Sequence, residues 1–162
     1  HDGTDIAVFV NGGYVMPMCD LNVIPTLSLA YSQHDEDAFI ETVGGASYMQ
    51  VFDFDADSLL SKLGVRVNRV FQVGGMQLLG QARLQWAHEF EDTDREATAR
   101  FLSPTGAAFT VKGVEPDPDS ALYGLDMSLY LTQALSVNVS FDGEWRDKFE
   151  AYGLAGGLRF VF

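Results

Sequence analysis

Hydrophobic and polar residues alternate with a period of two along most of this chain, and a helical period of 3.6 is almost absent. In the segment 135–146, Val137 and Val139 lie on one face, and Asn138 and Asp142 lie on the other. We therefore predict an all-β protein with seven amphipathic strands, each of about ten residues or more. The predicted strands are 5–15, 21–32, 59–71, 76–86, 123–132, 135–146 and 152–162.

The alternation alone leaves two classes of fold open. A soluble β-sandwich buries its apolar face against a second sheet, whereas a membrane β-barrel turns that face to lipid and its polar face to a lumen. Strands of this length are what a tilted membrane-spanning strand needs.

The lengths of the connections favour the membrane barrel. Short and long connections alternate: 16–20, 33–57, 72–75, 90–120 and 133–134. The long ones are acidic, with seven acids from Asp35 to Asp57 and eight from Glu89 to Asp119. Outer-membrane barrels combine short periplasmic turns with long extracellular loops in this way.

Aromatic residues near the strand ends point in the same direction, because rings gather at the two membrane interfaces. They are Tyr14, Tyr31, Phe71, Trp86, Phe90, Tyr123, Trp145, Tyr152 and Phe162. A soluble protein ending on an apolar strand at Phe162 would expose a hydrophobic edge, whereas a barrel closes that strand against the first one.

Composition excludes several functions. The 162 residues carry 23 acids and 10 bases, a formal charge of -13, so a nucleic-acid partner is not expected. The 47% apolar content argues against disorder. Cys19 is the single cysteine, which excludes an internal disulfide framework and multi-cysteine metal sites. No run of 18 apolar residues predicts a transmembrane helix, and residues 1–5 do not resemble the start of a signal peptide.

The sequence offers no convincing metal or catalytic motif. Residues 53–57 begin like a calcium loop, but the sixth-position glycine is missing and Gly64 stands where a bidentate glutamate belongs. His34 and His88 lie far apart without metal-ligand spacing. We therefore expect no cofactor, no metal and no enzymatic activity.

The C-terminal residues 157–162, Gly-Leu-Arg-Phe-Val-Phe, resemble the outer-membrane targeting signal of a glycine, alternating hydrophobic residues and a terminal aromatic residue. More of the chain, in order and spacing, resembles the translocator (β) domain of bacterial autotransporters. The segments that carry this resemblance are 23–32, 63–71, 82–90, 99–101, 109–113 and 152–160.

This resemblance implies an antiparallel up-and-down transmembrane barrel that exports a passenger in type V secretion. The family's barrel has twelve strands and a pore helix, so residues 1–162 would be its C-terminal portion, without passenger or pore helix. Alternatively, 47–54 or 97–113 adds a spanning strand, giving a small eight-stranded barrel that acts as an adhesin or structural protein. Because Pro104 and Gly106 interrupt 97–113, we expect an extracellular hairpin there instead.

The resemblance also assigns residues and partners. The barrel-assembly machinery would read Gly157, Phe160 and Phe162, and lipid and lipopolysaccharide would surround the barrel. The long loops would be extracellular, and the C-terminus periplasmic. Alternation places a set of charged residues of both signs toward the lumen: Lys62, Arg66, Arg83, Asp126, Asp142, Glu144 and Arg146.

Overall fold

The computed structural model describes residues 3–43, 46–91, 96–102, 106–113 and 116–161. All regular elements among these residues are β-strands. Seven long strands correspond to the seven predicted from the sequence: β1 (Gly3–Gly13), β3 (Leu21–Glu36), β6 (Phe54–Val73), β7 (Met76–Glu89), β10 (Asp119–Tyr130), β11 (Leu135–Arg146) and β12 (Phe149–Phe160). Among the residues described, no helix has the length and apolar character needed to cross a membrane.

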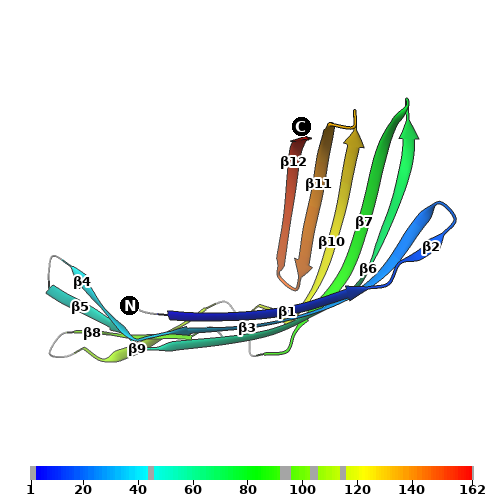
Figure 1. The fold of residues 1–162 in the computed structure, drawn as a ribbon. Coiled ribbons are helices and arrows are strands. Elements are labelled where there is room, and N and C mark those ends of the chain that lie inside the picture. The colour runs from blue at the N-terminus through cyan, green and yellow to red at the C-terminus, as the bar shows by residue number, and fades with distance from the viewer. Residues whose placement is uncertain (1–2, 44–45, 92–95, 103–105, 114–115, 162) are drawn as a thin grey trace. The chain divides into compact units, whose positions relative to one another are not determined.

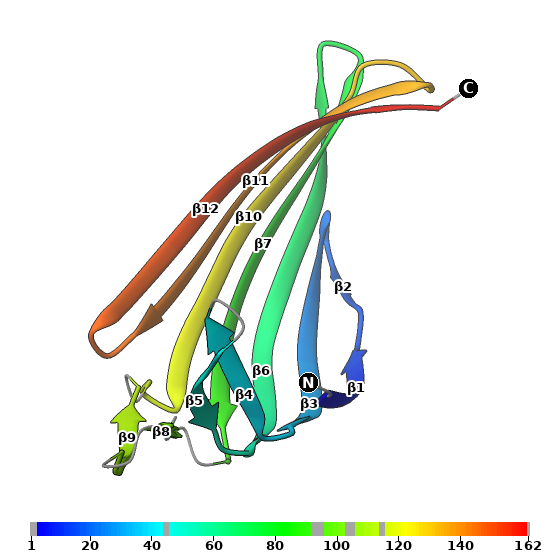
Figure 2. The same cartoon turned by 90° about the vertical axis from the view of Figure 1, so that its left-hand side faces the viewer.

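The long strands form one sheet in the order β1-β3-β6-β7-β10-β11-β12, and the short strand β2 (Met16–Met18) also pairs with β3. This order follows the sequence, as up-and-down topology requires. Figure 2 shows β7, β10, β11 and β12 side by side in this order. The pairs β7–β10, β10–β11 and β11–β12 are all antiparallel.

The chain divides into two compact units. One unit consists of His1–Phe9, Ala30–Leu60 and Glu89–Asp117, and the other of Val10–Leu29, Ser61–His88 and Pro118–Phe162. The second unit contains β7 as far as His88 and all of β10, β11 and β12, which carry most of the candidate site described below.

The registers align residues of like character across the second unit. Leu125 faces Ala82 on β7 and Phe141 on β11, and Phe141 in turn faces Leu154 on β12. We call this side of the sheet the apolar face. The opposite side, the polar face, carries Gln81, Arg83, Gln85, Asp126, Ser128, Asn138, Ser140, Asp142 and Glu144 on β7, β10 and β11.

Tight turns join the strands at 19–20 and 74–75, within the predicted connections 16–20 and 72–75. Gly74 and Gly75 have φ values of 56° and 81°, which glycine adopts without steric cost. Cys19 also has a positive φ, 57°, in the turn that follows β2. The predicted connection 16–20 is therefore shorter than expected, because Met16–Met18 pairs with β3.

The prediction that the strand 123–132 includes Leu131 and Thr132 is wrong. Strand β10 ends at Tyr130, and the hydroxyl oxygen of Thr132 accepts hydrogen bonds from the backbone N–H groups of Ala134 (3.1 Å) and Leu135 (3.0 Å). A threonine side chain that binds the backbone locally competes with strand pairing, so the turn begins earlier than the hydrophobic pattern indicates.

The long connections form a sheet of their own, in the first unit. Its order is β4 (Phe39–Val43), β5 (Ala46–Val51), β8 (Glu96–Phe101) and β9 (Ala108–Lys112). Figure 1 shows these short strands, with β4 and β5 as a hairpin. Strands β8 and β9 pair as the hairpin expected within 97–113. The alternative of an eighth spanning strand from 47–54 or 97–113 is wrong, because the strands within these segments, β5, β8 and β9, pair in this smaller sheet, and Phe54 already belongs to β6.

Candidate functional site

On the large sheet the apolar face is more exposed than the polar face, which is the reverse of what a soluble protein shows. Leu84 and Trp86 on β7 are 57% and 52% exposed, whereas the side chain of Arg83, which directly precedes Leu84, is 31% exposed. On β10, Leu125 is exposed and the adjacent Asp126 is half-buried. A β-sandwich would hide the apolar side chains between two layers, so this arrangement contradicts the soluble sandwich alternative.

An ion pair crosses the polar face from β7 to β11. Arg83 and Asp142 both lie opposite Gly124 of the intervening strand β10, and the Arg83 guanidinium reaches over Gly124 to the Asp142 carboxylate. A Cβ atom at Gly124 would lie 2.7 Å from Arg83 Nε. The absence of a side chain at Gly124 is therefore what allows this pairing across two strands.

A second pair lies next to it on β11. Arg146 Nε donates a hydrogen bond of 2.5 Å to Glu144 Oε1. Asp142 and Glu144 are thus each paired with an arginine, and the polar face holds both signs of charge close together.

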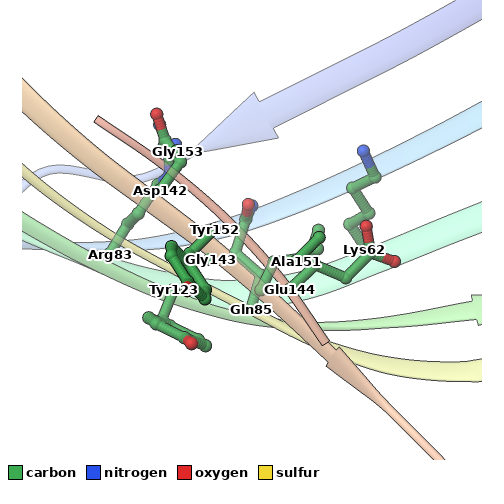
Figure 3. Close-up of a pocket in the computed structure, with 11 residues that line it drawn as sticks. Lys62, Arg83, Gln85, Tyr123, Asp142, Gly143, Glu144, Ala151, Tyr152 and Gly153 are labelled. Atoms are coloured by element: carbon green, nitrogen blue, oxygen red, sulfur yellow. The ribbon is translucent and has the colours of Figure 1, made fainter. Parts of the chain in front are cut away.

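Arg83, Asp142 and Glu144 of these pairs line a hollow of about 480 Å3. Figure 3 shows Lys62 of β6 on one side of the hollow, near Glu144 and Ala151, and Arg83 with Asp142 on the other side. Strand β12 contributes Ala151, Tyr152 and Gly153 to its lining. Lys62 is one of the lining residues, so its ammonium group adds a positive charge to the hollow.

The remaining predicted lumen residues occupy the same face without joining these pairs. Asp126 accepts a hydrogen bond of 3.1 Å from Gln81 Nε2. Arg66 is half-buried on β6, and its Nε is buried without an acceptor in the part of the chain that the structure describes. The structure thus brings Arg83 to Asp142 and Glu144 to Arg146, and it leaves Arg66 outside both pairs.

A close contact on the apolar face involves a second glycine. The ring of Tyr123 on β10 covers Gly143 of β11, where a Cβ atom would lie only 2.2 Å from Tyr123 Cζ. Neither Gly124 nor Gly143 was predicted from the sequence as a site residue. Glycine inside a strand signals close approach of another group, and this signal was present in both strands.

Two histidines that lie beyond the predicted spanning segments, His88 and His34, each contact a carboxylate. His88 Nδ1 and Trp86 Nε1 each lie 2.8 Å from Asp119 Oδ1. The hydrogen bond with His88, supported by that of Trp86, lowers the pKa of Asp119 below its usual value of 3.8. No group of three or more metal-binding side chains is found among the described residues.

In the other unit, His34 Nδ1 of β3 lies 2.5 Å from Asp5 Oδ1 of β1. The hydrogen bond to Asp5, together with its negative charge, raises the pKa of His34 above 6.5.

The predicted targeting residues fall on the last strand. Phe160 lies opposite Leu135 on the apolar face and is 66% exposed. Gly157 lies opposite Asn138 on the polar face, where an added Cβ would lie 3.2 Å from Asn138 Nδ2. Phe162 lies outside the described residues.

Comparison with known proteins agrees with this arrangement of strands. A family model described as "Autotransporter beta-domain" matches residues 1–142. Two relatives from Serratia marcescens, both named "Extracellular serine protease", are 26% identical over 157 residues and 21% identical over 155 residues. Each match covers 96% of this chain and 15% of the relative, so the chain spans about 15% of the length of these proteins.

Proposed function

The chain belongs to the autotransporter β-domain family of the bacterial outer membrane, and from this premise we propose that it is the C-terminal portion of a translocator barrel that exports its own passenger. The observation that carries the proposal is the inverted exposure of the large sheet, with apolar side chains such as Leu84 and Leu125 exposed and Arg83, Asp126 and Glu144 half-buried. Such a sheet suits lipid on one side and a hydrated pore on the other.

In this proposal the polar face lines the lumen. Arg83–Asp142 and Arg146–Glu144 would keep the pore wall polar without binding a passing chain tightly, because each charge already has a partner. Lys62 and Arg66 on β6 would supply positive groups to whatever polypeptide lies in the pore. The polypeptide in the pore would be the protein's own passenger or its pore helix, both outside this chain.

The orientation follows from the connections. We place the turns at 19–20, 74–75 and 131–134 in the periplasm and the small sheet β4-β5-β8-β9 outside the cell, because outer-membrane barrels have short periplasmic turns and long external loops. Lipid and lipopolysaccharide would contact the apolar face. The barrel-assembly machinery would recognise Gly157, Phe160 and Phe162 at the periplasmic end of β12.

Photo-crosslinking in the full-length protein tests the proposed route of export. A photoreactive residue replaces Lys62 or Asp142 on the polar face, and Leu125 or Val139 on the apolar face serves as the matched control. Export is stalled by a folded passenger, and the crosslinked segment is identified by mass spectrometry. Crosslinks from Lys62 and Asp142 to the passenger or its linker are expected. Passenger crosslinks that arise only from Leu125 and Val139 would overturn the proposal.

A further inference from the structure

The small sheet is amphipathic in its own right. Its register places Phe39, Val51, Ala99 and Phe109 in one row across β4, β5, β8 and β9. Ala97 and Val111 lie beside this row on the same face. The opposite face is polar, with a hydrogen bond of 2.9 Å from Arg100 Nε to Gln50 Oε1 and another of 2.9 Å between the Thr98 and Thr110 hydroxyl groups.

The apolar side of this sheet is hollowed. A cavity of about 390 Å3 is lined by Glu36, Phe39, Val51, Phe52, Phe54, Ala97, Val111 and Gly113, all within the first unit. Its volume falls in the range of pockets that hold small ligands or single side chains. Val111 is 57% exposed, so its isopropyl group is open to a ligand.

This cavity has a different character from the apolar face of the long strands. Apolar residues on the long strands are explained by lipid, but the small sheet belongs to the proposed extracellular loops. Apolar surface exposed to water on a polar background marks an interaction site. Its occupant must therefore bring apolar groups of its own.

The charges beside the cavity select the kind of occupant. Exposed Asp37, Asp53 and Asp55 each lie within two residues of a lining residue in the sequence, and Glu36 lines the cavity itself. Lys112 also adjoins two lining residues, Val111 and Gly113, but these acidic groups outnumber it. The guanidinium of Arg100 is engaged by Gln50 and lies 5.9 Å from the centroid of the Phe52 ring. An anionic lipid headgroup would be repelled by these carboxylates, whereas a cationic group would be attracted.

We propose that this cavity binds a basic polypeptide segment, with an apolar or aromatic side chain inserted between Phe39, Phe54 and Val111 and with flanking lysines or arginines against the carboxylates. The apolar anchor supplies affinity through burial, and the charges supply orientation and rate of association. The inference rests on the extracellular placement proposed above, because only there does the cavity meet a soluble partner.

The test measures binding of fluorescent peptides to the purified full chain in non-ionic detergent micelles, with empty micelles subtracted. The first peptide has one central phenylalanine among lysines. A second replaces the lysines by glutamates, and a third replaces the phenylalanine by serine. The first peptide is expected to bind at least about tenfold more tightly than either of the others, as loss of one buried apolar side chain or of the charge match implies.

Variants locate the binding. Val111→Gln is expected to weaken binding of the first peptide about tenfold. Ile40→Gln is the matched control, because Ile40 is similarly exposed, 53%, on the opposite face of β4. The Asp53→Asn, Asp55→Asn double variant is expected to weaken binding and to reduce its salt dependence.

Equal affinity for the lysine and glutamate peptides, or equal effects of Val111→Gln and Ile40→Gln, would overturn the inference. Protease treatment of intact cells tests the orientation separately. Cleavage within the small sheet supports extracellular loops, and protection of the loops would count against the proposed orientation while leaving the binding result in micelles interpretable.

Discussion

Arg83 of β7 pairs with Asp142 of β11 by reaching across β10 at Gly124. The two charged residues are not on neighbouring strands, so their contact depends on a strand that contributes no side chain at the crossing point. This relationship links the glycine positions of the sheet to the charge distribution on its polar face.

Gly124→Ala should therefore destabilise the protein by displacing the Arg83 guanidinium. We expect the free energy of unfolding to fall by about 1 kcal/mol, because the pair is partly exposed and screened by water. Gly153→Ala is the matched control, since an added Cβ there meets nothing within 4 Å. Urea unfolding in detergent, followed by tryptophan fluorescence, measures both. Equal stability of the two variants would show that the Arg83–Asp142 pair does not require the absence of a side chain at position 124.

A larger effect is expected on the other face. Gly143→Ala places a methyl group against the Tyr123 ring, and we expect a loss of about 1–3 kcal/mol, the usual cost of overpacking. The same substitution in a Tyr123→Leu background should cost less, because the ring is gone. A double-mutant cycle from urea unfolding gives the coupling energy. Additive losses would mean that Gly143 is required for a reason other than the tyrosine.

The contact between β1 and β3 should depend on pH. Asp5 raises the pKa of His34, so the charged pair stabilises these strand ends fully below pH 6.5 and is lost as the pH rises through the raised pKa. Amide exchange of Gly3–Phe9, corrected for the intrinsic rate, should become less protected at alkaline pH. His34→Gln should remove this pH dependence. A dependence that survives in His34→Gln would assign it to another group.

The turn between β11 and β12 holds a non-glycine residue in a left-handed conformation. Lys148 has φ of 61°, which costs an L-residue with a side chain roughly 1 kcal/mol relative to glycine. Lys148→Gly should therefore raise the free energy of unfolding by relieving this conformation. The gain is reduced in part, because glycine increases the conformational entropy of the unfolded chain. Gly75→Ala should have the opposite sign because Gly75 has φ of 81°. The midpoint of urea unfolding measures both, and a destabilised Lys148→Gly variant would contradict this account.

The long strands could be predicted from the sequence because period-two alternation persists through each of them. Strand ends were harder to predict: Leu131 continues the hydrophobic pattern, but the Thr132 hydroxyl group bonds to the turn. Only the hairpin at 97–113 of the small sheet was expected from the sequence. The β4–β5 hairpin lies inside the long acidic connection 33–57, and the pairing of β5 with β8 joins two loops far apart in the sequence.

The charged residues of the polar face were also accessible from alternation alone. Their partners were not, because pairing depends on register and on the space above Gly124. Alternation predicts the face of a residue, whereas strand register decides which residue it meets. For Arg66, alternation predicted that the side chain lies on the polar face, but not that its Nε would be buried without an acceptor among the described residues.

The central claim is that the polar face meets water and the apolar face meets lipid. Cysteine labelling tests it on adjacent residues of the full-length protein in outer-membrane vesicles, in a Cys19→Ser background. The paired variants are Leu125→Cys with Asp126→Cys on β10, and Val139→Cys with Ser140→Cys on β11. A small charged thiol reagent should react with cysteines at 126 and 140 and leave those at 125 and 139 unmodified. Rapid labelling at 125 and 139, with 126 and 140 protected, would contradict the account.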